Sequence, residues 1–509
     1  MKGPLDRGDV AVAILLAAGT IVYLVVMPWS LGASDEGYYL YHAVRVLGGE
    51  TLYRDISELI TPLYIDLMAL LFRTFGAAMA TARLAAAAIQ AGIMALIYLT
   101  CRAVGVRRGL AVAAALPHMA IGQPAWPYAT PHWLGTLLVS LLLLIGLDRQ
   151  RARRTGWTVV QGLLLGLVIV NRQQTGVVMG AALAVLVAAD RLADRRWRGA
   201  PGLSSLRQLA LLAVGAAAIV IPILGVHVAR AGVRPLVQQL VVQPLTGYRA
   251  VNRIAWGAVG FLSNTLALYT YAPLLQYFPL IVLPIGLLRA GIAWRPVRDR
   301  AYAERLLALC VFGVFSAVSI LYFPDFIHIT FIMPVVLVLA AEMLESLLRR
   351  GAPWTGRVGA VLITLLLAAC GLQMAYNLRR ARAEFPFVHE TAFGRIALGS
   401  QREVVGVDRI RRLLDNVPGR ELFIYPGFAA AYLLVGAHNP TRHDLIFPKY
   451  QSAEEIEGVI EALERRRPRY IALLRFAVQK DDPIGVYVAR HYHCDDDGLC
   501  VRTDDPTGE

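Results

Sequence analysis

Residues Ser34–Gly76 read SDEGYYLYHAVRVLGGETLYRDISELITPLYIDLMALLFRTFG, between an apolar run at Val10–Met27 and the next one at Ala78–Thr100. The stretch holds six of the sixteen acidic residues that precede Leu378, namely Asp35, Glu36, Glu50, Asp55, Glu58 and Asp66. Carboxylates are costly in hydrocarbon, so a chain that gathers them between two apolar runs places them at a membrane surface. We therefore expect a polar loop outside the bilayer, at about residues 30–77.

The end of this stretch, Thr61–Gly76, is apolar but only 16 residues long, and it carries Asp66 and Arg73. A straight span needs about 20 residues. Counting this segment as a span would also place Arg102–Arg108 on the outer side of the membrane, opposite to the other arginine-rich loops. We therefore expect a helix along the outer membrane interface.

The composition of the whole chain agrees with a polytopic α-helical membrane protein. Of its 509 residues, 57% are hydrophobic and 17% are charged, and the mean hydropathy is +0.54. Such a composition excludes a soluble globular enzyme, a disordered chain and a fibrous repeat. Apolar runs near bilayer length predict eleven transmembrane helices, near Val10–Met27, Ala78–Thr100, Leu110–Ile121, Trp133–Leu147, Trp157–Val170, Gly176–Ala189, Leu209–Val228, Pro273–Leu288, Leu306–Tyr322, Ile327–Leu347 and Val358–Met374.

The net charge of +14 comes from the membrane part of the chain. The first 377 residues hold 31 basic and 16 acidic residues, and the excess lies in short arginine-rich loops. Of these 31, 22 fall in six connecting segments that would share one side. The positive-inside rule then predicts a multi-pass protein of the cytoplasmic (inner) membrane, with its N-terminus in the cytoplasm and its C-terminus outside. This distribution needs no nucleic-acid partner.

Residues 378–509 have the composition of a water-soluble domain, and residues 1–377 that of a transmembrane domain. Strands expected at Glu421–Tyr425 and Tyr470–Arg475, with an amphipathic helix at Ala453–Arg466 between them, predict a small extracytoplasmic α/β domain. In its HYHCDDDGLC segment, Cys494 and Cys500 are six residues apart. A local disulfide is the leading interpretation in an oxidising compartment. A metal site that also uses His491, His493 and Asp495–Asp497 is the alternative.

The acidic stretch resembles the first outer loop of the GT-C membrane glycosyltransferases, in particular the protein O-mannosyltransferases and the aminoarabinose transferases of lipid A. Shared features are an acid soon after the first span, a short helix ending in Gly-Gly, the Tyr-Arg-Asp at Tyr53–Asp55 and a proline-led interfacial helix ending in Phe-Gly. Weaker likenesses are YATPHWLG at Tyr128–Gly135, NRQQTG at Asn171–Gly176 and FPDFIHITFIMP at Phe323–Pro334. One departure is the sequence ITP leading into Pro62, where many relatives have a lysine or an asparagine before the proline.

The resemblance implies transfer of a sugar, with inversion, from a polyprenyl-phosphate donor to a hydroxyl of a lipid, glycan or protein acceptor outside the membrane. By position, Asp35 is the expected general base, Glu36 the less favoured bearer of that role, and Asp55 the second acid of the family, which assists the base or binds a metal. No cofactor is certain, and a divalent metal is compatible with the acids. A carboxylate within hydrogen-bond reach of an attacking hydroxyl accelerates such a reaction by about 10²–10⁴.

The donor phosphate needs a cation, and the family lysine before Pro62 is missing here. The candidates on the outer side are Arg172, His328, His132, Arg249 and Arg253. Snorkelling of the arginine and ordinary interfacial histidines are the alternatives to phosphate binding. Tyr425, His443 and Asp444 could touch an acceptor, although turn and surface roles are preferred for them.

Two other classes of function compete with the enzyme. A transporter or flippase of lipid-linked sugars would place charges at the membrane midplane and show internal repeats, and the sequence shows neither. A non-catalytic membrane anchor would present the outer domain to a partner, and its acidic loop would tolerate substitution.

Overall fold

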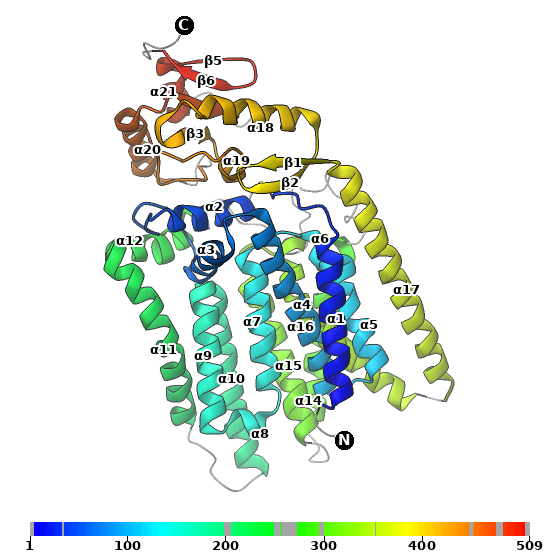
Figure 1. Ribbon diagram of the computed structural model, residues 1–509. Helices are drawn as coiled ribbons and strands as arrows, with labels where there is room; N and C mark the ends of the chain where they lie inside the picture. The colour runs from blue at the N-terminus through cyan, green and yellow to red at the C-terminus, as the bar shows by residue number, and fades with distance from the viewer. Residues whose placement is uncertain are drawn as a thin grey trace.

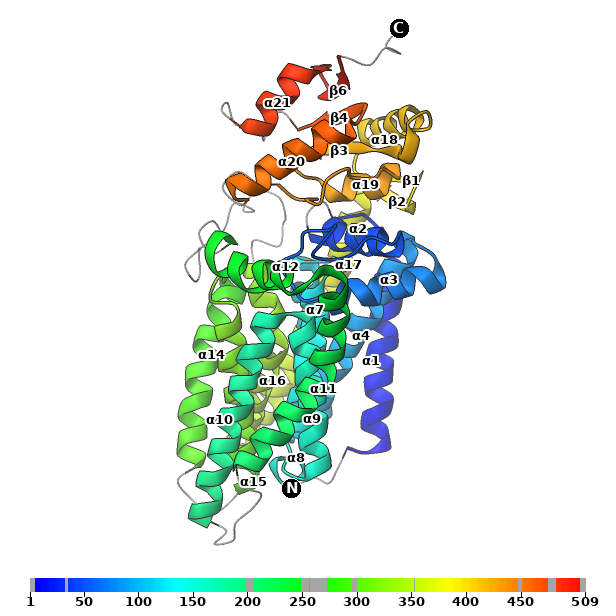
Figure 2. The ribbon, with the colours of Figure 1, turned by 90° about the vertical axis from the view of Figure 1, so that its left-hand side faces the viewer.

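The computed structural model describes residues 5–32, 35–197, 205–248, 256, 272–294, 300–351, 353–446, 451–474 and 482–503. Long helices run side by side and form a bundle, and all the strands gather beyond one of its ends (Figure 1). The N-terminus lies at the other end of the bundle, and the C-terminus lies beyond the strands (Figures 1 and 2).

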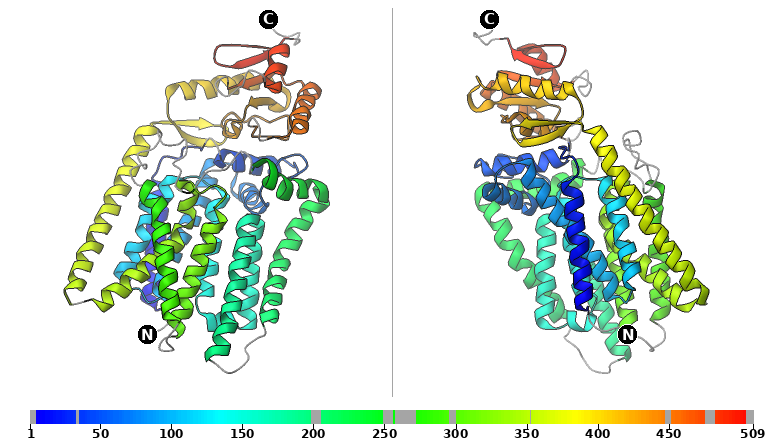
Figure 3. Two further views of the ribbon diagram at one scale, coloured as in Figure 1. Left: turned by 180° about the vertical axis from the view of Figure 1, so that it is seen from behind. Right: turned by 45° about the vertical axis from the view of Figure 1, so that its right-hand side comes forward.

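Eight helices of the described residues are long and apolar enough to cross a membrane. They are α1 (Arg7–Val25), α4 (Met79–Ala103), α10 (Gln173–Trp197), α11 (Ser205–Ala231), α14 (Ala272–Ala293), α15 (Arg300–Ser319), α16 (Phe326–Arg350) and α17 (Pro353–Glu384). Two shorter apolar helices, α7 (Pro131–Gly146) and α9 (Thr155–Asn171), lie beside them in the bundle (Figures 1 and 3). The chain thus has the helices of a multi-pass membrane protein.

The predicted apolar runs all coincide with helical segments. The run at Leu110–Ile121 corresponds to α5 (Arg108–Pro117), which continues through η1 (His118–Gly122) into α6 (Gln123–Ala125). Together with the ten apolar helices above, these segments account for the eleven runs. Eleven crossings remain a prediction, because length and apolar composition alone support only eight among the described residues.

Arginines assigned to the cytoplasmic side lie at the same end of the bundle as the N-terminus. Arg102 and Arg108 each bind the buried carboxylate of Asp9 in α1, at 2.8 and 2.9 Å. Arg149 of α8 (Arg149–Ala152) pairs with Asp190 of α10 at 2.8 Å. These ion pairs join the helices at this end, opposite to the acidic stretch.

The acidic stretch folds into two helices that lie between the bundle and the strands, α2 (Asp35–Leu47) and α3 (Leu63–Phe75) (Figures 1 and 2). Helix α12 (Val233–Val237) lies at the same level. Helix α3 begins after Pro62 and ends at Gly76, whose φ of 94° suits glycine. The helix expected at Thr61–Gly76 is therefore present, and it lies at the end of the bundle rather than among the long helices.

The C-terminal part contains two sheets. A hairpin pairs β1 (Phe387–Thr391) with β2 (Gly394–Leu398). The second sheet has the order β3-β4-β6-β5, in which β3 and β4 are parallel and the other neighbours antiparallel. Its strands are β3 (Leu422–Tyr425), β4 (Tyr470–Leu473), β5 (Tyr492–Cys494) and β6 (Leu499–Arg502), and the helices of this part are α18 (Gln401–Leu414), η7 (Pro418–Arg420), α19 (Ala429–Val435), α20 (Ala453–Arg466) and α21 (Pro483–His491).

The expected elements of this part are found where the sequence predicts them. Strands β3 and β4 lie within the two predicted strands, and α20 has the predicted bounds. Helix α20 begins with a capping box, in which the side chains of Ser452 and Glu455 each accept the other residue's backbone N–H. Tyr470 and Ile471 of β4 are buried, and Ile471 belongs to an apolar layer through which the sheet packs on α20 and α21.

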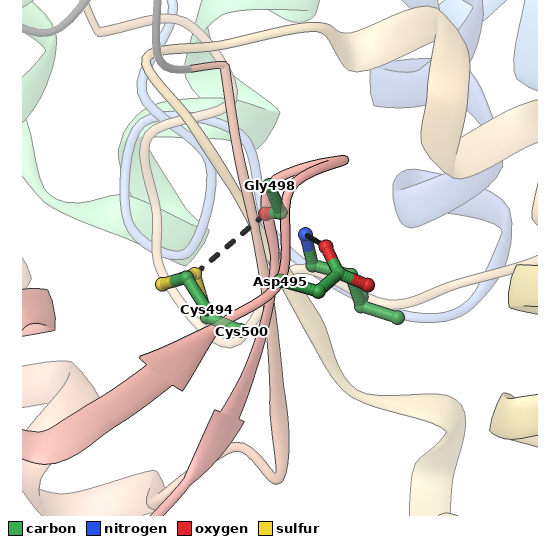
Figure 4. The surroundings of a disulfide bond; sticks show 5 residues. Cys494, Asp495, Gly498 and Cys500 are labelled. Carbon is green, nitrogen blue, oxygen red and sulfur yellow. Dashed lines mark hydrogen bonds between the residues drawn. A yellow bond between two sulfur atoms is a disulfide. The ribbon is translucent and has the colours of Figure 1, made fainter.

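Cys494 and Cys500 face each other across β5 and β6 (Figure 4). Their sulfur atoms are joined, with the two Cα atoms 3.8 Å apart. In the turn of the same hairpin, the Asp495 carboxylate accepts a hydrogen bond from the backbone N–H of Leu499 at 2.9 Å. The two cysteines thus close the hairpin at the end of the sheet.

Candidate functional site

Asp35 is the first residue of α2, at the end of the bundle that faces the strands. Its side chain is half-buried and forms no hydrogen bond or ion pair with another described residue. Burial raises the pKa of this carboxyl above its ordinary value, and the charges of Asp325 and Glu58 raise it further. His328 and Arg172 oppose this rise. The carboxylate therefore lies near cations without being tied to a described partner.

Three of the predicted phosphate-binding side chains lie close together. Arg172 directly follows α9, His132 is the second residue of α7, and His328 lies in the first turn of α16. The rings of His132 and His328 are 5.4 Å apart between centroids, and the charge of Arg172 acts on both Asp35 and His132. We call Asp35, Arg172, His132 and His328 the Asp35 cluster. It joins four elements that are distant in sequence.

Two further side chains orient this cluster. Asp325 caps α16 by accepting the backbone N–H of His328 at 2.8 Å, and it contacts Nδ1 of the same histidine at 2.7 Å. Such a pair fixes the orientation of an imidazole ring. The hydroxyl of Tyr322 accepts a hydrogen bond from Nη2 of Arg172 at 2.8 Å. Asp325 lies in the FPDFIHITFIMP segment at Phe323–Pro334 that carries one of the weaker likenesses, whereas no sequence pattern pointed to Tyr322.

Glu36 has a different environment from Asp35. Its carboxylate is fully buried, and each oxygen accepts one backbone N–H, from Gly32 at 2.8 Å and from Ala129 at 2.7 Å. Arg83 of α4 pairs with both oxygens at 2.9 Å. Burial nevertheless raises the pKa of Glu36, although Arg83 and the two N–H groups counteract it. With four donors in place, Glu36 has the surroundings of a structural anchor.

The side chain of Asp55 has only local contacts among the described residues. It accepts the N–H of Thr51 at 2.9 Å and pairs with Arg54 at 2.8 Å. The hydrogen bond from Arg54 lowers the pKa of Asp55, and about a third of its side chain is exposed. No described contact joins it to the Asp35 cluster, so a role as second acid stays a prediction. Arg249 and Arg253 lie outside the described residues.

A buried polar network connects α2 to the C-terminal part of the chain. Arg45 of α2 binds both carboxylate oxygens of Asp444 at 2.8 Å and pairs with Glu50 at 2.6 Å. His42 of α2 contacts Asp444 at 3.0 Å and Glu58 at 2.9 Å. Asp444 is 2% exposed, so the expectation of a surface role for it is wrong, although it does lie in a bend of the chain. Its partners Arg45 and His42 lie about 400 positions earlier, which is why local sequence did not suggest them.

The same interface needs a glycine and stacked aromatic rings. A Cβ atom on Gly37 of α2 would come within 2.6 Å of backbone atoms of Ala430 in α19. The rings of Tyr41 and Tyr432 stack with centroids 4.7 Å apart. Helix α2, which begins with Asp35, is therefore held closely against the C-terminal part.

The described residues contain no group of three or more His, Cys, Asp or Glu side chains that could hold a metal ion. Cys494 and Cys500, which the alternative interpretation would use as metal ligands, are bonded to each other in the closed hairpin. His491 and His493 lie in or next to the same hairpin, but they form no such group within the part of the chain that is described.

The Asp35 cluster combines a carboxylate that has no described partner with an arginine and two imidazoles. The carboxylate can accept a proton from a hydroxyl, and the arginine can hold an anionic oxygen with two parallel hydrogen bonds. Imidazole groups can donate further hydrogen bonds to the same anion. This set suits the attack of a hydroxyl on a carbon whose leaving group is a phosphate.

No family model and no curated protein matches the sequence. Among solved structures, the chain is similar to ArnT from Cupriavidus metallidurans bound to undecaprenyl phosphate, with 15% identity over 97% of each chain and a TM-score of 0.57. It is also similar to the apo form of the Archaeoglobus fulgidus oligosaccharyltransferase, with 13% identity over 91% of this chain and 69% of that one and a TM-score of 0.54. Another structure of that oligosaccharyltransferase is a complex with Zn and sulfate. The likeness predicted from the acidic loop is confirmed at the level of architecture, and the chain has the GT-C fold of membrane glycosyltransferases.

Proposed function

We propose that this protein is a membrane glycosyltransferase that moves a sugar from a polyprenyl-phosphate carrier to an acceptor hydroxyl outside the cytoplasmic membrane. The observation that carries the proposal is the Asp35 cluster, in which a carboxylate without a described partner lies near Arg172 and His328. The fold supports the same conclusion, because one protein with this fold, ArnT, has been crystallised with undecaprenyl phosphate.

Asp35 would act as the general base. The acceptor oxygen attacks C1 of the sugar while its proton passes to Asp35, and the bond between C1 and the phosphate oxygen breaks. The electron pair of that bond stays on the phosphate, which leaves as polyprenyl phosphate. Because attack and departure take place on opposite faces of C1, the configuration at C1 is inverted.

Arg172, His132 and His328 would stabilise the leaving phosphate. The charge on its oxygens grows as the bond to C1 breaks, and fixed donors lower the energy of that state. Arg172 is always charged and can bind two phosphate oxygens at once. It takes the place of the lysine that many relatives have before Pro62.

The placement of the parts follows from the same proposal. Residues 1–377 would form the transmembrane catalytic domain of the inner membrane, and residues 378–509 an extracytoplasmic α/β domain. The Asp35 cluster and the strands lie at the same end of the bundle. A cytoplasmic N-terminus would put both on the outer side, where lipid-linked donors and envelope acceptors meet.

The direct test is release of polyprenyl phosphate from polyprenyl-phosphate monosaccharides by the purified protein in lipid nanodiscs, with envelope glycolipids as acceptors. We expect release by the native protein and its loss in Asp35→Asn. Asp408→Asn is the matched control, because Asp408 pairs with His389 at 2.8 Å in the C-terminal part and has no role in the Asp35 cluster. Native protein without activity toward any such donor would refute the proposal.

A further inference from the structure

His42 is fully buried between two carboxylates from distant parts of the chain. Its Nδ1 lies 2.9 Å from an oxygen of Glu58, and its Nε2 lies 3.0 Å from an oxygen of Asp444. Glu58 and Asp444 are 1% and 2% exposed. The first contact has hydrogen-bond geometry, whereas the second is close but not aligned and acts as an ion pair.

Both carboxylates also accept hydrogen bonds from other donors. The second oxygen of Glu58 accepts the N–H groups of Leu59 at 2.7 Å and Ile60 at 3.0 Å. Asp444 receives Arg45 and the side-chain amide of Asn439, the latter at 2.6 Å. Burial alone raises the pKa of Asp444, but Arg45 and His42 outweigh it and lower the pKa to about 2.

An imidazole between two acceptors is best satisfied as the imidazolium, because only this form has an N–H on both nitrogens. Burial by itself lowers the pKa of His42, but Asp444 and Glu58 outweigh it, so that the pKa is raised. Apart from these two carboxylates, the ring of Tyr38 lies against His42 at 4.0 Å between centroids, and Arg45 stands behind Asp444. A positive charge on His42 therefore has two negative charges in contact and one positive charge beyond them.

Glu58 connects this triad to the Asp35 cluster. Its negative charge is one of those that raise the pKa of Asp35. His42 follows Asp35 by about two turns of the same helix, so it lies on the same face of α2. The imidazolium thus neutralises, at contact distance, a carboxylate that acts on the expected base.

We propose that His42 is a positioning residue of the candidate active site, whose charge holds Glu58 in place, compensates the negative charge that Glu58 exerts on Asp35 and, through Asp444, makes the C-terminal part a component of that site. The inference rests on the proposed function only in taking Asp35 as the base. His42 itself touches no reacting atom and acts through Glu58.

The test is the pH profile of kcat/KM in His42→Gln. Glutamine can still donate to one carboxylate but carries no charge, so Glu58 acts on Asp35 uncompensated. The acidic limb of the profile is the pH range in which kcat/KM falls because the base becomes protonated. We expect this limb to move to higher pH by about one unit, so that kcat/KM at a pH on the limb falls about tenfold. Glu58→Gln should move the limb down, and the double variant should return it toward the native position. A purely structural defect cannot produce that reversal.

His438→Gln is the matched control. His438 pairs with Glu50 at 2.8 Å in the same interface, but its side chain is 43% exposed and Glu50 is not among the main charges acting on Asp35. The acidic limb should stay in place in this variant. A limb that does not move in His42→Gln, while Asp35→Asn abolishes turnover, would overturn the inference and leave the proposed function intact.

A second measurement tests the imidazolium without any activity. Because the folded pKa of His42 is raised, its charge stabilises the fold below about pH 6.5 and this stabilisation is lost as the pH rises through the folded pKa. The difference in thermal midpoint between native protein and His42→Gln should therefore shrink with rising pH. A difference independent of pH would overturn the inference even if no glycosyl transfer were found.

Discussion

Substituting each of two adjacent acids, Asp35 and Glu36, should separate catalysis from stability. In Asp35→Asn, the amide breaks no contact among the described residues, because the carboxylate has no partner there. Turnover should fall by about 10²–10⁴, the usual contribution of a general base. Burial raises the folded-state pKa of Asp35, so the fold is most stable while this carboxyl is protonated, below the unfolded pKa. That stability is lost as the pH rises through the folded pKa, because the buried carboxyl must then ionise. The thermal midpoint at neutral pH should therefore be unchanged or higher.

Glu36→Gln should do the opposite. Each oxygen of Glu36 accepts a backbone N–H, so either orientation of the amide turns its NH₂ toward a second donor, at Gly32 or at Ala129. A buried donor without an acceptor costs about 1–3 kcal/mol. Loss of the buried pair with Arg83 brings the destabilisation to about 3–5 kcal/mol. We expect a thermal midpoint lower by several degrees, with turnover per folded molecule much less affected than in Asp35→Asn.

The assay combines thermal unfolding in one detergent with turnover per folded molecule, measured on the same preparations. Fully active Asp35→Asn would refute the assignment of the base. A stable but inactive Glu36→Gln would move that role to Glu36 and contradict the anchoring function deduced from its four donors.

Three further results are expected. Arg172→Ala should bind polyprenyl phosphate about 10- to 100-fold more weakly in a binding titration, since a hydrogen bond to a charged group contributes about 1.5–3 kcal/mol. His328→Ala, by contrast, should mainly lower turnover. Cysteines introduced at positions 452–464 should react with an impermeant label in intact cells, and one introduced near Arg151 should react only after permeabilisation. Gly37→Val should lower the thermal midpoint by several degrees, because its side chain has no room against the backbone of α19.

Each of these results has a clear contrary outcome. Unchanged affinity in well-folded Arg172→Ala would remove that side chain from the phosphate site, leaving Arg249 and Arg253 to be tested. Labelling of positions 452–464 only after permeabilisation would invert the membrane orientation. Gly19→Ala is the control for Gly37, since a Cβ there meets nothing within 4 Å among the described residues, and an equal effect of both changes would contradict the packing argument.

The bundle could be predicted from the sequence because its signal is local. An apolar run of bilayer length forms a helix whatever its neighbours are, since every backbone polar group in hydrocarbon must find a partner within the helix. The same holds for α20, which begins with its own cap at Ser452. The predicted histidines and Arg172 also lie together, because each occurs at the end of an apolar run on the side expected to be outside.

The pairings within the site could not be predicted in this way. Glu36 and Arg83 are 47 positions apart, and Arg45 and Asp444 are 399 apart. Which carboxylate is paired and which is not depends on how the helices pack, so the sequence could not show that Glu36 is tied to four donors and Asp35 to none of the described residues. The polar side chains of α2 do share a spacing, at Tyr38, His42 and Arg45, that suits one helix face. That pattern could have pointed to a buried polar interface.

The interface between α2 and the C-terminal part also limits how this chain can be recombined. The Tyr41 hydroxyl accepts the backbone N–H of Asn439 at 2.8 Å, Arg45 binds Asp444, and Glu50 pairs with His438. A chimaera that takes only residues 378–509 from another protein would inherit half of each contact, including buried charges without partners. A transplant that also carries residues 35–58 would keep every one of these pairs together. In a domain exchange, the first loop and the C-terminal part must therefore be transferred together, although more than 300 residues separate them in the sequence.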